Sequence, residues 1–256
     1  MATTEVVGPP AENRAPSPAT ARGLGATQRK DNWWLQPVAV FIGLSIFGIY
    51  STWAALVGNN YYAAPYLSPF YSPLIIAKWW KFSPAILILW MPLGFRATCY
   101  YYRKAYYRSF FLDPPACAVG ESGEHRYCGE TRFPYLLQNA HRYFLYLAIM
   151  VLAFLWHDAY NGFWFDGQFG IGIGSLVLVL NCVLLSGYTL GCHSLRHLIG
   201  GRMDTQNGSC ASCWKGVTRF NEHHLLWAWM SLTVVGLTDL YVRLVAAGII
   251  HDVRLF

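Results

Sequence analysis

Seven residues whose side chains commonly bind metal ions are concentrated between Gly191 and His224. They are Cys192, His193, His197, Cys210, Cys213, His223 and His224. Thiolate and imidazole ligands together suit zinc ions and iron–sulfur clusters. Long apolar segments flank this stretch on both sides, so the sequence predicts a redox centre at one face of a membrane.

Spacing within this stretch favours some of these ligands over others. Cys210 and Cys213 form a C-x-x-C pair. Such a pair can chelate one metal ion or act as a redox dithiol, and two unligated loop cysteines are the third reading. His193 and His197 are spaced i and i+4, so in a helix both imidazoles can reach one site. His224 begins a polar stripe on the next apolar segment, and such stripes normally face the interior of a helix bundle.

The composition is that of a membrane protein. Of the 256 residues, 55% are hydrophobic and 12% are charged, whereas about a quarter of the residues of a soluble domain are charged. Residues 1–32 have no apolar core, and we expect them to form a disordered cytoplasmic tail. Residues 33–256 are expected to form one transmembrane domain.

Five apolar segments reach the length of about 20 residues that a helix needs to cross a bilayer. They run from about 33 to 57, 84 to 111, 141 to 156, 172 to 198 and 224 to 250. The predicted fold is therefore an all-α, polytopic bundle of five transmembrane helices. Asp239 and Arg243 are spaced i and i+4 within the last segment, and we expect them to form a structural ion pair.

The distribution of lysine and arginine predicts the orientation. The tail carries four, the stretch from Arg96 to Arg142 carries seven, and the stretch from Arg196 to Arg219 carries four, whereas the other face has Lys78, Lys81 and Arg254. The N-terminus is thus predicted to be cytoplasmic and the C-terminus external. The net charge of +6 then reflects orientation in a plasma membrane and does not indicate nucleic-acid binding. Cysteines on the cytoplasmic side should be thiols or metal ligands, with disulfides disfavoured.

Topology and helical spacing together suggest a ligand set of two thiols and two imidazoles. The preferred ligands are Cys210, Cys213 and His193, with either His197 or His224; Cys192, Cys117, Cys99 and His141 are held in reserve. Such a set suits structural zinc or a Rieske-type [2Fe–2S] cluster, in which two Cys hold one iron and two His hold the other. Two haems are excluded because the outer side offers only His157 and His251. Two alternatives stay open. One is a single haem b bound between two of the cytoplasmic-side histidines, and the other is a thiol–quinone oxidoreductase that uses the C-x-x-C.

Five tyrosines and four basic residues lie between Arg96 and Arg108. Hydroxyl and guanidinium groups can hydrogen-bond quinone carbonyls, and we single out Arg103 and Tyr107 as candidate contacts. The alternative is an aromatic belt with snorkelling cations. His141 opens the third segment and is a metal ligand, a quinone contact or a helix-end residue.

Several long runs resemble one known family. They are FRATCYYYRKAYYRSFF, PPACAV, GETRFPYLLQNAHRYFLY, LSGYTLGCHSLRHLIGGR and NEHHLLWAWMSLTVVGLTDLYVRL. Over residues 30 to 256 the chain resembles the cytochrome b-like membrane anchor of actinobacterial succinate dehydrogenases, of the mycobacterial kind called type F of respiratory complex II.

This resemblance implies an anchor that passes electrons to quinone, menaquinone or ubiquinone, within succinate:quinone oxidoreductase. It implies a flavoprotein that oxidises succinate and an iron–sulfur partner docked on the cytoplasmic face, in the lipid bilayer of the plasma membrane. It also implies a Rieske-type [2Fe–2S] cluster in place of haem, although the chain lacks the C-x-H and C-x-x-H spacing of Rieske domains. The oligomeric state stays open, including a higher oligomer.

Overall fold

The computed structural model describes residues 23–121, 135–200 and 210–256. Within these residues the regular secondary structure is mostly helical, and four helices are long and apolar enough to cross a membrane. They are α1 (Leu35–Val57), α4 (His141–Asn161), α5 (Ile173–Leu190) and α8 (His224–Ala246). The shorter helices are α2 (Ile86–Ala97), α3 (Tyr100–Tyr106), α6 (His193–Gly200) and α7 (Cys210–Glu222).

The remaining elements are short. Two hairpins of two-residue strands pair β1 (Tyr62–Ala63) with β2 (Tyr66–Leu67) and β3 (Trp164–Phe165) with β4 (Gln168–Phe169). The 3-10 helices are η1 (Pro69–Tyr71) and η3 (Tyr135–Ala140), and the π-helical turn is η2 (Tyr107–Phe111).

Contacts divide the chain into two units. In the smaller, which includes residues 23–41 and 105–121, the segment before α1 is hydrogen-bonded to the loop after η2. Gly25 N donates to Gly120 O at 2.9 Å and Thr27 Oγ1 donates to Ala118 O at 2.7 Å. Of the tail expected over residues 1–32, residues 1–22 lie outside the described part of the chain.

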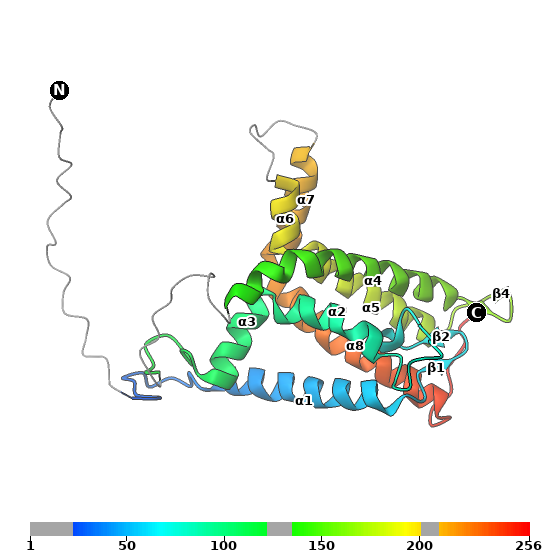
Figure 1. Cartoon of the computed structure of the whole chain (residues 1–256), viewed down its shortest axis with the longest axis horizontal. Helices are drawn as coiled ribbons and strands as arrows, with labels where there is room; N and C mark the ends of the chain where they lie inside the picture. The colour runs from blue at the N-terminus through cyan, green and yellow to red at the C-terminus, as the bar shows by residue number, and fades with distance from the viewer. Residues whose placement is uncertain (1–22, 122–134, 201–209) are drawn as a thin grey trace, which may run out of the picture. The chain divides into compact units, whose positions relative to one another are not determined.

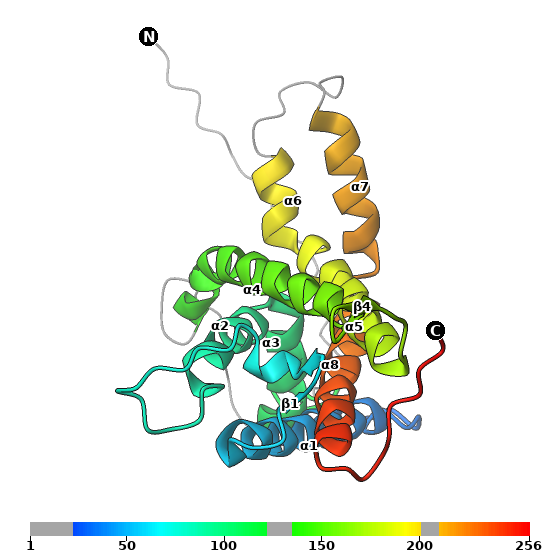
Figure 2. The same cartoon turned by 90° about the vertical axis from the view of Figure 1, so that its right-hand side faces the viewer.

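The larger unit holds α2, α4, α5 and α8, which run side by side (Figures 1 and 2). α5 packs most extensively against α8, and α4 packs against both α5 and α2. The shared core includes Ile88, Val151, Leu178 and Val242, one from each helix. Burial of such side chains contributes about 1.5–3 kcal/mol each.

Two of the expected spans end earlier in the structure than the sequence predicted. The segment expected over 84–111 is divided into α2, α3 and η2, with Pro92 inside α2 and a break at Thr98 and Cys99. The segment expected over 172–198 ends at Leu190, and Gly191 and Cys192 separate α5 from α6. Aromatic and apolar residues occur on both sides of each break together with basic ones, so composition alone did not reveal where the spans end.

Glycine is required at the second break because another backbone passes close to it. A Cβ atom on Gly191 would lie 2.7 Å from Gly187 O and 3.0 Å from Phe220 O. Gly191 O in turn accepts a hydrogen bond from Asn221 Nδ2 at 2.8 Å. The end of α5 and the end of α7 are therefore joined directly at this point.

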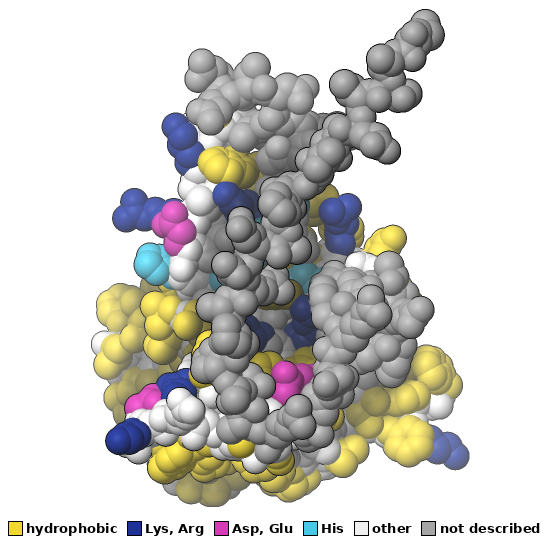
Figure 3. Space-filling view, turned by 90° about the vertical axis from the view of Figure 1, so that its left-hand side faces the viewer, with side chains coloured by type: hydrophobic (Ala, Val, Ile, Leu, Met, Phe, Trp, Pro, Cys, Tyr) yellow, Lys and Arg dark blue, Asp and Glu magenta, His cyan; other side chains and the backbone are white. Residues whose placement is uncertain are grey.

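The surface matches the expected membrane setting. Most of α1 faces outward, and Ile46, Ile49 and Leu56 are each more than half exposed. α6 and α7 form a hairpin that rises from the end of the bundle where α5 ends and α8 begins (Figure 1). Lysine and arginine side chains gather around this hairpin, whereas hydrophobic side chains cover the bundle below it (Figure 3).

The ion pair expected between Asp239 and Arg243 is confirmed, and it is fully buried. Arg243 Nε donates to Asp239 Oδ2 at 2.7 Å, and the two residues are 5% and 0% exposed. Tyr50 and Ser68 also donate to this carboxylate, while the guanidinium donates to Asn59 O and Ala54 O. One buried pair thus ties α1 and the 58–83 connection to α8.

Replacement of Asp239 by Asn should strongly destabilise the protein, because it leaves the Arg243 charge buried without a counterion. The expected loss is about 3–5 kcal/mol, measured by thermal unfolding in detergent. Asp31→Asn is the matched control, since its pair with Arg29 is exposed and exposed pairs contribute little. Equal unfolding temperatures for the two variants would contradict this assignment.

Candidate metal centre and adjoining cavity

Two cysteines and two histidines occupy helix junctions at the end of the bundle from which the hairpin rises. Cys99 lies between α2 and α3, and Cys192 lies between α5 and α6. His141 is the first residue of α4 and His224 is the first residue of α8. A residue at a helix end can turn its side chain toward the bundle axis without interrupting the apolar faces of the spans.

These four side chains form two thiol–imidazole pairs. Cys192 Sγ lies 3.1 Å from His141 Nε2, and Cys99 Sγ lies 3.5 Å from His224 Nε2. The pairs are neighbours, because His141 stacks on Phe95, His224 stacks on Tyr188, and these two aromatic rings lie with centroids 5.4 Å apart. Among the described residues no three such side chains converge as a single metal ion would require. Because the two pairs are neighbours, the set suits a centre of two metal atoms in which both thiols hold one atom and both imidazoles hold the other.

His141 is held in the tautomer that a metal ligand needs. The Thr98 hydroxyl donates its only proton to Gly94 O at 2.7 Å, so at 2.9 Å from His141 Nδ1 it acts as the acceptor. The imidazole proton is therefore on Nδ1, and the lone pair of Nε2 faces Cys192. The ring is also stacked on Phe95, with centroids 4.7 Å apart. Such outer contacts orient metal-binding histidines.

The other pair contains buried atoms that lack partners. His224 stacks on Tyr188 with centroids 5.0 Å apart, and both His224 Nδ1 and the Tyr188 hydroxyl are buried without a hydrogen-bond partner. The Cys192 thiol is buried as well, at 1% exposure. A cation is the kind of group that favours the thiolate form at such a position. The orphaned atoms and the donor set together fit a bound metal centre.

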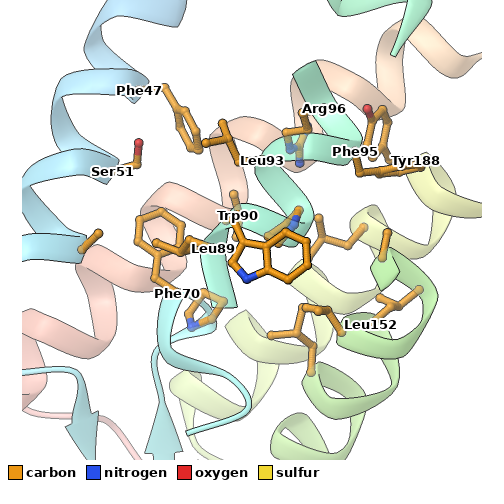
Figure 4. A pocket seen from close by; sticks show the side chains of 18 of the residues that line it. Phe47, Ser51, Phe70, Leu89, Trp90, Leu93, Phe95, Arg96, Leu152 and Tyr188 are labelled. Carbon is orange, nitrogen blue, oxygen red and sulfur yellow. The ribbon is translucent and has the colours of Figure 1, made fainter. Parts of the chain in front are cut away.

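An apolar cavity of about 370 Å³ adjoins this centre (Figure 4). Its wall includes Phe95 and Tyr188, the two rings on which His141 and His224 stack. From there it follows α2 to Ile86 and reaches Pro69 in η1. Its length along α2 is about 15 Å at 1.5 Å per residue. The cavity is largely hydrophobic; Arg96, Tyr188 and Thr189 are its polar residues beside the centre, and Ser51 and Thr52 line it on α1.

Arg96 is the charged residue of the cavity wall. Its Nη2 donates to Ser231 Oγ at 3.0 Å and its Nη1 donates to the Tyr102 hydroxyl at 2.5 Å. The guanidinium also lies over the Tyr188 ring, 4.6 Å from its centroid. No carboxylate in the described part of the chain pairs with it. An uncompensated cation in an apolar bundle is unfavourable, so this site favours a ligand with electron-rich oxygen.

The structure brings only some of the predicted site residues together. His224 and His141 belong to the centre, whereas His193 and His197 face each other on α6, exposed, with Nε2 atoms 3.0 Å apart. Partial burial of the imidazole and then the neighbouring His197 lower the pKa of His193. Cys213 is exposed on α7. Cys210 begins α7, but its side chain lies outside the described residues.

None of the three predicted quinone contacts is among the residues that line the cavity, although His141 stacks on Phe95, which is. Arg103 lies over the Tyr100 ring at 4.7 Å and is not among the residues that line the cavity. Tyr107 belongs to the smaller unit, where its ring contacts Phe111. The wall residues Arg96 and Tyr188 were not singled out from the sequence. One feature of the sequence could have indicated Arg96 as a site residue: it lies within an apolar segment, several residues before the other basic residues.

Comparison with known proteins agrees with this architecture. A family model described as "Actinobacterial succinate dehydrogenase subunit SdhC" matches residues 35–248. A solved structure titled "Mycobacterium smegmatis Sdh1 complex in the apo form" contains a chain that is 41% identical, with a TM-score of 0.84. The match covers 94% of this chain and 97% of that chain. No curated protein matches.

Replacement of Thr98 by Val should weaken metal binding, because it removes the acceptor that holds the His141 tautomer. We expect metal affinity to fall about 10–100-fold, measured as iron retained by the purified protein during dialysis against a chelator. Thr238→Val is the control, since the Thr238 hydroxyl donates only to Val234 O within α8. Equal iron retention in both variants would contradict the role given to Thr98.

Proposed function

The chain belongs to the actinobacterial SdhC family of succinate dehydrogenase subunits, and on that premise we propose that it is the membrane anchor at which quinone is reduced. As an SdhC subunit it is part of a succinate dehydrogenase in the membrane. In the proposal, succinate is oxidised on a flavoprotein partner and electrons arrive through an iron–sulfur partner. The reaction is that of a succinate:quinone oxidoreductase.

The proposed cofactor is a Rieske-type [2Fe–2S] cluster held by Cys99, Cys192, His141 and His224. The single observation that carries the proposal is the juxtaposition of these two buried thiol–imidazole pairs with an apolar cavity that shares their aromatic wall. Two Cys and two His are the protein ligands of a Rieske-type cluster. When bound, the cluster would supply one-electron transfer between the iron–sulfur partner and quinone.

This ligand set replaces most of the one predicted from spacing. It keeps His224 and brings in His141, Cys99 and Cys192 from the reserve. The i and i+4 pair on α6 and the C-x-x-C on α7 are set aside because His193, His197 and Cys213 are exposed. A buried ligand set is preferred because a redox centre in a dry site is shielded from solvent, which influences its potential.

The cavity is the proposed quinone site. A ring placed at its inner end would lie against Phe95 and Tyr188, and a carbonyl oxygen would accept a hydrogen bond from Arg96. Negative charge that develops on this oxygen during reduction would be stabilised by the Arg96 cation. The apolar wall along α2 and α4 would take the isoprenoid tail. Both menaquinone and ubiquinone have a ring with carbonyl oxygens and an isoprenoid tail.

The projecting hairpin is the proposed docking surface for the iron–sulfur partner. It stands at the end of the bundle that carries the four ligands, so a partner bound there would be close to the cluster. Arg196, Lys215 and Arg219 give it positive charge, consistent with the predicted cytoplasmic side. The proposed topology keeps five spans, with α2 and α3 together completing the second, and a cytoplasmic N-terminus.

The cofactor assignment predicts a rhombic, Rieske-like EPR signal in the dithionite-reduced complex. Cys99→Ser and His141→Gln should each abolish this signal and quinone reduction, while succinate oxidation by an artificial dye continues on the partner. The control combines His193→Gln, His197→Gln and Cys213→Ser, which should leave the signal intact.

Loss of the signal in the hairpin variant, with the signal retained in Cys99→Ser and His141→Gln, would show that the ligands lie on the α6–α7 hairpin. A sharp haem band in the reduced-minus-oxidised optical spectrum would establish haem b in place of the cluster. A mixed disulfide trapped at Cys210 or Cys213 during turnover would instead favour thiol–quinone chemistry.

Filling the cavity should block quinone without disturbing the cluster. Leu152 lines the cavity, and Leu152→Trp should lower the rate of quinone reduction at least about tenfold, equivalent to about 1.4 kcal/mol. The EPR signal and dye reduction should be retained. Leu237→Trp, on the exposed face of α8, is the matched control. Equal quinone reduction by the two variants would place the quinone elsewhere.

A further inference from the structure

The connection between η1 and α2 forms a loop whose two ends are held together. Ser83 Oγ donates to the Tyr71 hydroxyl at 3.1 Å, which joins the end of the loop to its beginning. Ser72 Oγ donates to a carboxylate oxygen of Asp158 on α4. The base of the loop is therefore fixed to the bundle, whereas residues 73–82 extend away from it, as in a compact surface loop.

This loop lies at the level where membrane helices begin and end. The Tyr71 hydroxyl donates to Ala54 O in the last turn of α1 at 2.9 Å, and Ser83 shortly precedes the start of α2. Figure 2 views the bundle from one end and shows the loop reaching sideways past the helices. The ends of membrane spans lie where the hydrocarbon meets the headgroups, so the loop extends along that boundary.

The side chains of the loop are large, apolar and uncovered. Ile76, Trp79 and Phe82 are 76%, 75% and 69% exposed. Trp80 packs edge-on against both Trp79 and Phe82, with ring centroids 5.7 and 5.3 Å away. The rings thus support one another in an arrangement that leaves the outer two open to the surroundings. Exposed apolar patches of this kind mark contact with a membrane or with a protein.

Two lysines lie within this apolar surface. Lys78 and Lys81 are exposed, and no carboxylate in the described part of the chain forms an ion pair with either of them. The stretch 58–85 contains neither Asp nor Glu. Lysine is disfavoured on the external face of membrane proteins, where this loop is predicted to lie. Two such cations beside exposed aromatic rings therefore indicate an anionic partner.

A phospholipid surface fits this pattern better than a protein does. Tryptophan is enriched where headgroups meet acyl chains, because its ring is apolar and its N–H is polar. Lysine can keep its methylene stem beside the acyl chains while its ammonium group reaches the phosphates. The sideways direction of the loop also leads into the space that lipid occupies around a membrane bundle.

We propose that residues 74–82 form a phospholipid-binding loop of the outer leaflet. Its exposed aliphatic and aromatic side chains enter the boundary between headgroups and acyl chains, and Lys78 and Lys81 bind the phosphates of anionic headgroups. Entry removes apolar surface from water, and each lysine adds an attraction that salt weakens. This inference is independent of the proposed function, because it involves neither the cluster nor the quinone.

The experiment is photo-crosslinking of the whole complex in nanodiscs of phosphatidylcholine with a minor share of phosphatidylglycerol. With p-benzoylphenylalanine in place of Ile76, lipid adducts should form and be identified by mass. Phosphatidylglycerol should be enriched among them at least about fivefold over its share of the bilayer, and added salt should lower this enrichment. Combining Lys78→Gln with Lys81→Gln should abolish the enrichment, whereas lipid adducts should persist.

Two controls separate the loop from the rest of the surface. Arg254→Gln removes another exposed cation of the same predicted face and should leave the enrichment unchanged. The same photoreactive residue in place of Ile46, exposed on α1, should form lipid adducts without headgroup preference.

Four results would contradict the proposal. Adducts in proportion to the bilayer composition, or enrichment that survives loss of both lysines, would overturn the headgroup contact. Adducts with another subunit or with a second copy of this chain would make the loop a protein-docking surface instead. Absence of any adduct at position 76 would show that the loop faces water.

Discussion

The centre of this protein depends on breaks in membrane helices at which the freed backbone groups are satisfied. Inside a bilayer every backbone N–H and C=O needs a partner within the protein. At the first break Cys99 N donates to Arg96 O and the Thr98 hydroxyl is a second donor to Gly94 O, and at the second break Asn221 Nδ2 donates to Gly191 O. These contacts allow Cys99 and Cys192 to leave the helical path and point into the bundle. A continuous helix would carry the same residues on surfaces set by its own periodicity.

The Thr98 hydroxyl at the first break also fixes the tautomer of His141. Thr98 is fixed by its bond to Gly94 and can only accept from His141, which directs the lone pair of Nε2 toward Cys192. Stacking on Phe95 and Tyr188 then holds the two imidazole planes. Because these rings also line the cavity, the proposed sites for cluster and quinone share one wall. Such a shared wall keeps the two close and leaves little room for water between them.

The two arginines inside the bundle, Arg243 and Arg96, have different kinds of partner. At the end away from the centre, Arg243 is neutralised by Asp239 and its remaining donors reach backbone carbonyls, so the pair is complete and structural. Beside the centre, Arg96 is held by hydroxyls, a carbonyl and aromatic faces without a carboxylate. The first arrangement stabilises the fold, and the second keeps positive charge available to a ligand.

The sequence by itself determined the class of protein, the approximate positions of four membrane helices, the family and the Asp239–Arg243 pair. These features depend on composition and on spacing of a few residues, which a linear pattern records directly. It also indicated a thiol and imidazole centre at this end of the bundle. Only the tertiary structure brought together Cys99 with His224 and Cys192 with His141. These partners are 125 and 51 residues apart along the chain, and their meeting depends on helix packing and on breaks that apolar composition conceals. Local spacing favoured His193, His197 and the C-x-x-C because neighbours in sequence are the only partners that spacing can identify.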